Sequence, residues 1–283
     1  MMDMSEFANI PMRMVGPIKI IGDLVNDEVL VPMATYETPL WPSTARGAKV
    51  SREAGGIRAV LVDDRMTRSV VFEGSDAQFV SEVAKALSLR KNEIAREIST
   101  TSRFAQLIDF HYQIVGNLLY LRFELSTGDA SGHNMVTKAA DCVVSWILKE
   151  YAKLHYISIS GNFCTDKKVS AVNGILGRGK YVVTEMVIPK AVCQSILKTT
   201  PRAIVDLNIK KNFIGSTLAG SLRSANAHYA NMLLAFYLAT GQDAANIIEG
   251  SQGITHAELR GEDLYFSATL PNVIVGSVGN GKE

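Results

Sequence analysis

The chain has 283 residues, enough for one large domain or two closely packed ones, because single cores stop growing at about 250–300 residues. Its 29 Lys and Arg residues nearly balance 28 Asp and Glu residues, so no strong overall field favours nucleic acid or anionic lipid as a partner. Residues 1–17 contain no cationic segment followed by an apolar run, and no later stretch approaches the roughly 20 apolar residues of a membrane span. We therefore expect a cytoplasmic protein that does not enter a membrane.

The cysteine and histidine patterns argue against disulfide and metal chemistry. Cys142, Cys164 and Cys193 are odd in number, widely spaced and include no C-x-x-C pair, which argues against a disulfide framework and a zinc cage. The five histidines include no pair at i, i+4, so a metal site would need ligands from distant segments. No metal cofactor is predicted.

From residue 69 onward the pattern of apolar residues predicts a compact αβ unit. We expect a strand at 69–72, a helix at 76–98, strands at 105–115 and 117–125, a helix at 132–152 and a strand at 155–160. Residues 118–125 alternate between two side-chain sets, the period of a half-buried antiparallel strand. The order β-α-β-β-α-β is typical of a ferredoxin-like domain.

This unit, residues 69–160, is predicted to be inserted into a larger mixed α/β domain formed by residues 1–68 and 169–283, with 161–168 as a connecting loop. The fold class is therefore α+β. The longest helix of the large domain is expected at 219–240, because Gly241 follows it as a stop signal.

Three segments suggest a binding site. Residues 174–180, GILGRGK, approach a phosphate-binding loop, but Tyr181 stands where a Ser or Thr hydroxyl is needed, so a glycine-rich turn before a strand is favoured. Residues 128–134, GDASGHN, follow a strand and open a helix whose free N–H groups could hold a phosphate; an Asp or Ser helix cap is the simpler alternative. Residues 160–168, SGNFCTDKK, pack donors and acceptors at a strand end.

Four blocks of the sequence together resemble the signature blocks of the hydroxymethylglutaryl-coenzyme A (HMG-CoA) reductase family. They are PMATYE at 32–37, TGDASGHNM at 127–135, SGNFCTDKK at 160–168 and GQD at 241–243, in the family's order and near its spacing. The resemblance implies an oxidoreductase that interconverts HMG-CoA and mevalonate plus coenzyme A by two hydride transfers, with NADPH or NADH as cofactor. It also implies a homodimer or a dimer of dimers, in which Lys167 of one chain completes the neighbour's site.

Matching positions carry the family's roles to individual residues. The resemblance implies that the catalytic residues are Glu37, Lys167 and Asp243. The residues expected to hold or support the hydroxymethylglutaryl group are Arg68, Ser160, Asn162, Asp166, Lys168, Lys211 and Asn231, and those expected to contact coenzyme A are Ser43 and Lys198. The residues expected to hold the nicotinamide cofactor are Ser102, Arg103, Asp129, Ser131, Gly132, His133 and Asn134.

The chain departs from the family pattern at two places. Ser131 and His133 stand where the family usually has methionines, which leaves the choice between NADH and NADPH open. The family also continues past Gly281 into a helical segment with a histidine that protonates the departing thiolate, whereas the sequence ends at Glu283. We therefore expect the sequence as given to be either an incomplete version of the protein or a form impaired in this step, and a catalytically silent CoA-thioester binding protein is the alternative function.

Overall fold

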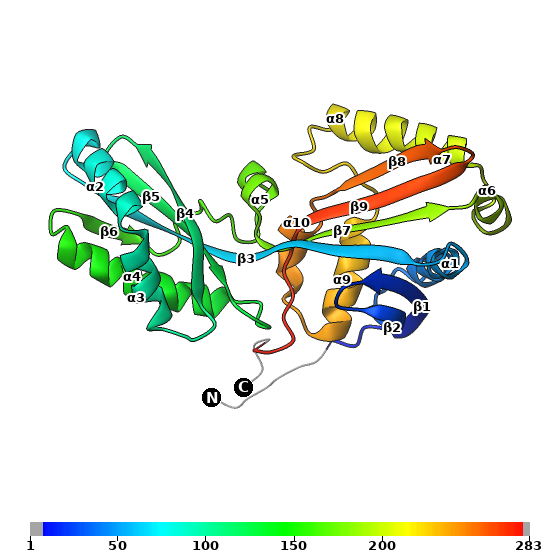
Figure 1. Ribbon diagram of the computed structural model, residues 1–283, viewed down its shortest axis with the longest axis horizontal. Coiled ribbons are helices and arrows are strands. Elements are labelled where there is room, and N and C mark those ends of the chain that lie inside the picture. Colours follow the sequence, from blue (N-terminus) through cyan, green and yellow to red (C-terminus); the bar gives the residue numbers. More distant parts are fainter. Residues whose placement is uncertain (1–7, 280–283) are drawn as a thin grey trace. The chain divides into compact units, whose positions relative to one another are not determined.

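The computed structural model describes residues 8–279, which divide into two compact units (Figure 1). Unit 1 comprises Met1–Val60 and Val182–Leu270, and unit 2 comprises Leu61–Tyr181 and Pro271–Glu283. Both units contain helices and strands, so the predicted α+β class is confirmed. The termini of the predicted domains lie outside the described residues, and their boundaries stay a prediction.

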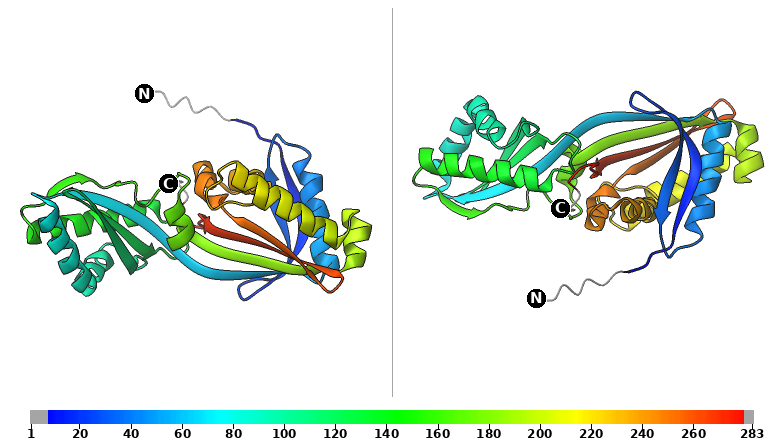
Figure 2. Two further views of the ribbon diagram at one scale, coloured as in Figure 1. Left: turned by 90° about the horizontal axis from the view of Figure 1, so that it is seen from above. Right: turned by 90° about the horizontal axis from the view of Figure 1, so that it is seen from below.

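Unit 2 contains the element order expected from the sequence. After β3 (Ile57–Glu73) follow α2 (Ala77–Leu89), α3 (Lys91–Ser99), β4 (Gln106–Val115), β5 (Leu118–Ser126), α4 (His133–Glu150) and β6 (His155–Ser158). The strands pair antiparallel in the order β6-β3-β5-β4. Figures 1 and 2 show α2, α3 and α4 packed along this sheet. The assignment of this unit as an inserted ferredoxin-like domain stays a prediction.

Two of the expected elements of unit 2 have different limits. The strand at 69–72 is the end of the much longer β3, and the helix expected at 76–98 is divided at Arg90, which leaves helical geometry with φ −107° and ψ 26°. Asp76 begins the first of these helices, because its side chain accepts a hydrogen bond from the Phe79 N–H at 2.8 Å.

The sheet of unit 2 has one apolar face and one buried polar face. On β5, Leu119, Leu121, Phe123 and Leu125 are fully buried in the apolar core against the helices, while Arg122 and Glu124 point the other way and are also fully buried. Other polar residues buried on β3 or in the segment 170–178 are Thr67, Ser69, Asn173 and Arg178. Buried polar residues in such number are unusual in a fold core and mark the face where function is expected. Helix α5 (Ala171–Leu176) belongs to the segment that follows the 160–168 loop.

Unit 1 has its own mixed sheet and two small apolar clusters. Strand β1 (Met12–Gly22) pairs antiparallel with β2 (Asn26–Ala34) and parallel with the start of β3, and the strand order is β2-β1-β3-β7-β9-β8. The remaining strands are β7 (Gly179–Ile188), β8 (Ile254–Arg260) and β9 (Asp263–Val273). The longer helices are α1 (Leu40–Glu53), α7 (Pro201–Leu207) with the π-helix η2 (Asn208–Gly215), and α9 (Tyr229–Thr240). The shorter helical pieces are α6 (Lys190–Val192), the π-helix η1 (Cys193–Leu197), α8 (Ser216–Leu218), the 3-10 turn η3 (Ala244–Asn246) and α10 (Ile247–Gly250).

The helix expected at 219–240 begins only at Tyr229, so that prediction was wrong for its first ten residues. Ala225 instead forms a parallel bridge with Ile254, donating its N–H to the Gly253 carbonyl at 2.8 Å and accepting from the Thr255 N–H at 2.9 Å. His228, with φ 66°, then turns the chain into α9. Ala225 is thus paired with a strand about 30 residues further along the chain, which is incompatible with a helix at this position.

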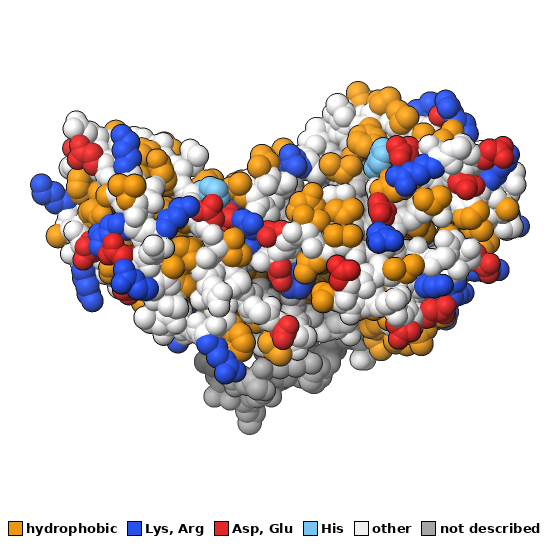
Figure 3. Space-filling view, in the orientation of Figure 1, with side chains coloured by type: hydrophobic (Ala, Val, Ile, Leu, Met, Phe, Trp, Pro, Cys, Tyr) orange, Lys and Arg blue, Asp and Glu red, His pale blue; other side chains and the backbone are white. Residues whose placement is uncertain are grey.

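The surface agrees with the balanced composition. On the face shown in Figure 3, basic and acidic side chains are interspersed on both units. None of the helices in the described part of the chain combines the length and apolar character needed to cross a membrane.

Candidate functional site

The backbone of the 160–168 loop is held in an unusual conformation. Asn162, Thr165 and Lys167 have φ values of 58°, 47° and 55°, in the left-handed region. Asn tolerates this region, but for a β-branched Thr or a Lys each such residue costs roughly 1–2 kcal/mol. Strained positions persist only where surrounding contacts determine them, and they cluster at functional sites.

Contacts with the polar face of unit 2 fix this loop. Ser69 on β3 accepts the Gly161 N–H with its carbonyl and the Phe163 N–H with its hydroxyl, both at 3.0 Å. The Asn173 amide donates to the Thr165 carbonyl at 3.2 Å, and Cys164 is fully buried. The loop is therefore anchored from Gly161 to Thr165.

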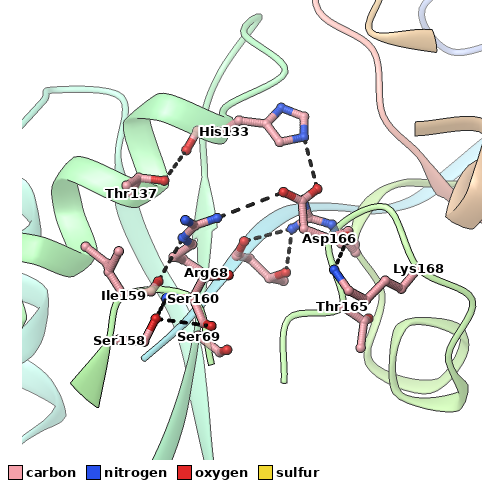
Figure 4. A network of polar contacts seen from close by, with 12 residues as sticks. Arg68, Ser69, His133, Thr137, Ser158, Ile159, Ser160, Thr165, Asp166 and Lys168 are labelled. Atoms are coloured by element: carbon pink, nitrogen blue, oxygen red, sulfur yellow. Dashed lines mark hydrogen bonds and ion pairs between the residues drawn. The ribbon is translucent and has the colours of Figure 1, made fainter. Parts of the chain in front are cut away.

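Asp166 is the centre of a cluster of cationic side chains (Figure 4). Arg178 donates to its Oδ1 at 2.6 Å, the His133 Nε2 lies 3.6 Å from the same oxygen, and the Arg68 guanidinium lies 3.9 Å from Oδ2. Burial alone would raise the pKa of Asp166, but the His133 and Arg178 hydrogen bonds and charges outweigh it and hold that pKa well below its ordinary value. Asp166 is thus an anion that orders the cations around it.

The predicted hydroxymethylglutaryl-binding residues of unit 2 lie in one group. Arg68 donates to the Ile159 carbonyl at 3.0 Å, one residue before the exposed Ser160, and the Lys168 ammonium donates to the Asp166 carbonyl at 3.0 Å (Figure 4). Lys167 is half-buried and Asn162 is exposed. Cations that converge on one loop can stabilise a carboxylate or a developing oxyanion.

The predicted cofactor residues of unit 2 form a second group beside α4. Gly132 occupies the N-cap of α4 with φ 92°, so no side chain from this position covers the N–H groups of the first turn. The simpler alternative, an Asp or Ser cap, is therefore wrong for this helix. His133 extends from the first turn to Asp166 and so joins the helix to the 160–168 loop.

The other cofactor candidates flank this turn. The Ser126 hydroxyl donates to the Phe104 carbonyl at 3.2 Å, which holds the segment after α3 beside the end of β5. Arg103 stacks on the Phe104 ring, with 4.7 Å from its guanidinium carbon to the ring centroid. Arg103, Asp129 and Asn134 are exposed and Ser102 and Ser131 are half-buried, so all are accessible to a ligand.

Unit 1 carries a separate group around Glu37. The Asn231 amide in the first turn of α9 donates to the Glu37 carboxylate, and the Thr35 hydroxyl accepts the Glu37 N–H at 2.9 Å. These residues line a cavity of about 400 Å³ between β2 and α9, together with Ile10, Ala34, Tyr36, Ala230, Leu234, Ala235, Leu238 and Ile247. A carboxylate at the rim of an apolar cavity is suited to proton transfer.

The remaining candidates of unit 1 lie on other elements. Asp243 follows α9, where its side chain accepts the Ala245 N–H at 3.1 Å and begins η3. Ser43 is exposed on α1, Lys211 is exposed on η2, and Lys198 is exposed at the end of η1 with φ 57°. Their roles toward coenzyme A and substrate stay predictions.

One buried residue of the site was not predicted. Arg178 was interpreted only as part of a glycine-rich turn, yet it is 1% exposed and binds Asp166. The phosphate-loop alternative for this segment is wrong, because helix α5 precedes it, strand β7 follows it, and the Lys180 ammonium pairs with Asp64 at 2.8 Å. The sequence feature that could have indicated the role of Arg178 is its position between two glycines.

Comparisons with known proteins identify the family of the chain. Residues 5–283 match the model of the family described as hydroxymethylglutaryl-coenzyme A reductase. The 3-hydroxy-3-methylglutaryl-coenzyme A reductase of Pyrococcus abyssi is 44% identical over 281 residues, which cover 99% of this chain and 69% of that protein. The enzyme of the same name from Aeropyrum pernix is 44% identical over 96% of this chain and 65% of its own length.

The fold is also known from solved structures. The class II 3-hydroxy-3-methylglutaryl-CoA reductase of Streptococcus pneumoniae, bound to NADPH in open conformations, superposes with a TM-score of 0.76 at 17% identity and covers 99% of this chain and 76% of that one. At this identity the likeness concerns the fold alone.

Proposed function

Because the chain belongs to the HMG-CoA reductase family, we propose that it is an oxidoreductase that interconverts HMG-CoA and mevalonate plus coenzyme A. The observation that carries this proposal is the 160–168 loop, whose strained backbone presents Lys167 beside a fixed cluster of Asp166, Arg68 and Lys168. Such a loop suits a reaction in which negative charge develops on a carbonyl oxygen.

Reduction of a thioester to an alcohol takes two hydride transfers, and each one places negative charge on the carbonyl oxygen. We propose that the Lys167 ammonium stabilises that oxygen, because a fixed cation strengthens its interaction as the charge develops. Arg68 and Lys168 would hold the substrate carboxylate. Glu37, oriented by the Asn231 amide, would donate the proton that converts the alkoxide into an alcohol, and Asp243 would support it.

The residues beside α4 fit a nicotinamide dinucleotide, which supplies the hydride when bound. A Cβ at Gly132 would lie 2.6 Å from Thr127 Cγ2, so this turn strongly favours glycine, and the N-cap residue places no side chain over the first turn of α4, where we propose that a phosphate binds. Arg103, Asp129 and Asn134 are exposed beside it. We propose that these residues, with Ser102, Ser131 and His133, hold NADPH or NADH.

The imidazole of His133 distinguishes this cofactor site from its family pattern, and we expect measurable activity with NADH. The measurement is kcat/KM for NADH and for NADPH under the same conditions. A preference for NADPH greater than about a hundredfold, equal to about 2.7 kcal/mol, would contradict this expectation.

The activity itself is tested by nicotinamide absorbance with HMG-CoA and, separately, with mevaldehyde, the aldehyde between the two hydride transfers. We expect HMG-CoA-dependent oxidation of the cofactor that is lost in Lys167→Ala. If the chain binds HMG-CoA and cofactor tightly but oxidises no cofactor with either HMG-CoA or mevaldehyde, the result would instead support the alternative, a catalytically silent CoA-thioester binding protein.

We also propose a homodimer or a dimer of dimers, in which Lys167 of one chain serves the Glu37 and Asp243 site of its neighbour. Lys167→Ala and Glu37→Gln should each be nearly inactive alone, because each removes an interaction made in the transition state. After mixed refolding they should regain about a quarter of wild-type activity, since half of the random dimers are mixed and each holds one intact site of two. No recovery, with mixed dimers confirmed by mass, would show that each site forms within one chain.

A further inference from the structure

Arg178 is a buried cation whose hydrogen bonds join two distant segments of unit 2. Its side chain is 1% exposed, although arginine is rarely buried without a partner. Nη1 donates to the Thr67 carbonyl at 2.8 Å and to the Thr67 hydroxyl at 2.9 Å, and Nη2 donates to Asp166 Oδ1 at 2.6 Å. One planar guanidinium thus holds β3 and the 160–168 loop at a set separation.

The two residues that Arg178 joins each precede a cation of the candidate site, one substrate-binding and one catalytic. Thr67 is followed by Arg68, and Asp166 is followed by Lys167. Asp166 also lies 3.9 Å from the Arg68 guanidinium. A shift of the Arg178 side chain would therefore move Arg68 and Lys167 relative to each other.

The main chain that carries Arg178 is itself firmly held. The flanking Gly177 and Gly179 have φ values of 85° and 93°, and a Cβ at Gly179 would lie 2.6 Å from the Val273 carbonyl oxygen. The Gly177 carbonyl accepts a hydrogen bond at 2.6 Å from Arg122, which is fully buried. The sequence Gly-Arg-Gly thus combines a backbone conformation that favours glycine with a side chain long enough to reach the 160–168 loop.

We propose that Arg178 is a positioning residue for the reaction: it sets the Asp166–Lys167 segment relative to Arg68 and does not itself touch the substrate. This inference rests on the proposed reductase function. A lysine at position 178 would keep the positive charge but present one ammonium in place of the two-branched guanidinium, so it could not satisfy Thr67 and Asp166 in the same geometry.

The experiment compares Arg178→Lys with Lys180→Met in the complete protein. Lys180 is two residues away and pairs with Asp64 outside the loop, so its replacement controls for loss of a cation in the same segment. The measurements are kcat and KM for mevaldehyde, the cofactor Kd, the melting temperature, and hydrogen–deuterium exchange of residues 161–168. We expect Arg178→Lys to lower kcat about a hundredfold, the loss typical of a displacement of about 1 Å at a catalytic group, with the cofactor Kd within about twofold of wild type. Exchange in the loop should accelerate, and Lys180→Met should match wild type.

A double-variant comparison separates positioning from a general structural role. In a Lys167→Ala background, Arg178→Lys should change the small residual kcat for mevaldehyde, measured at high enzyme concentration, by no more than about twofold, because it acts through the residue already removed. An equal loss in both backgrounds, or unchanged loop exchange in Arg178→Lys, would overturn the proposal. If Arg178→Lys does not fold, the variant Thr67→Val tests the proposal in its place. It removes the hydrogen bond from Arg178 to the Thr67 hydroxyl and should lower kcat about fivefold, and an unchanged kcat would overturn the proposal.

The outcomes keep the two proposals apart. If the wild-type protein oxidises no cofactor with either substrate, the reductase function fails, while hydrogen–deuterium exchange still shows whether Arg178 fixes the loop. If the wild-type protein is active and Arg178→Lys matches it in kcat, the reductase function stands and the positioning role is refuted.

Discussion

The substitution Gly132→Ala should weaken both the stability of unit 2 and its cofactor binding. Gly132 has φ 92°, where an L-residue is strained by roughly 1–2 kcal/mol. Its new Cβ would lie 2.6 Å from Thr127 Cγ2 and 2.7 Å from Oγ1, so the Thr127 side chain must move. That motion breaks the hydrogen bond from the Thr127 hydroxyl to the Ala130 carbonyl at 3.0 Å, whose net contribution is about 1 kcal/mol. Together these effects predict a loss of about 2–3 kcal/mol in the free energy of unfolding.

Gly116→Ala is the matched control, because it isolates the conformational effect. Gly116 lies in the tight turn between β4 and β5 with φ 60°, and nothing lies within 4 Å of the position that its Cβ would take. This variant should lose about 1 kcal/mol and bind cofactor like wild type. Urea unfolding followed by circular dichroism gives both free energies, and a fluorescence titration gives the cofactor Kd, which should rise about tenfold for Gly132→Ala alone. If Gly132→Ala is no more destabilising than Gly116→Ala, the crowding argument is wrong.

Two further predictions concern the charged groups of the site. Because His133 and Arg178 lower the folded-state pKa of Asp166, the ionised carboxylate stabilises the protein above its ordinary pKa near 3.9. The difference in free energy of unfolding between wild type and Asp166→Asn should thus be constant above about pH 5 and shrink as the pH falls below about 4. Urea unfolding from pH 3 to 7 measures this difference. A difference that instead grows toward low pH would contradict the lowered pKa of Asp166. Asn231→Ala removes the donor to Glu37 and should lower kcat for mevaldehyde about tenfold with an unchanged cofactor Kd, whereas a changed Kd with constant kcat would assign Asn231 to cofactor binding.

Local patterns were sufficient for much of unit 2. The period-two alternation of residues 118–125 predicted strand β5 and its apolar face, but the prediction of a half-buried strand was wrong, because Arg122 and Glu124 on the other face are buried as well. In unit 1, the glycine at 241 marked the end of α9 where the structure places it. These features depend on backbone geometry and on contacts between residues close in sequence, so they can be predicted from a short stretch of residues. The family resemblance also pointed to Arg68, Asp166 and His133, which the structure brings together around the 160–168 loop.

The sequence alone therefore determined the α+β class, the order of elements in unit 2 and the family to which the site residues are matched. Tertiary structure decided what depends on distant partners. Residues 219–228 are not helical because Ala225 pairs with Gly253 and Thr255, and no local propensity records that competition. Arg178 became part of the site only through its hydrogen bonds to Thr67, 111 positions away, and to Asp166. A buried guanidinium is selected by the geometry of acceptors that meet only after folding, which is the physical reason that its role could not be deduced from the residues around it.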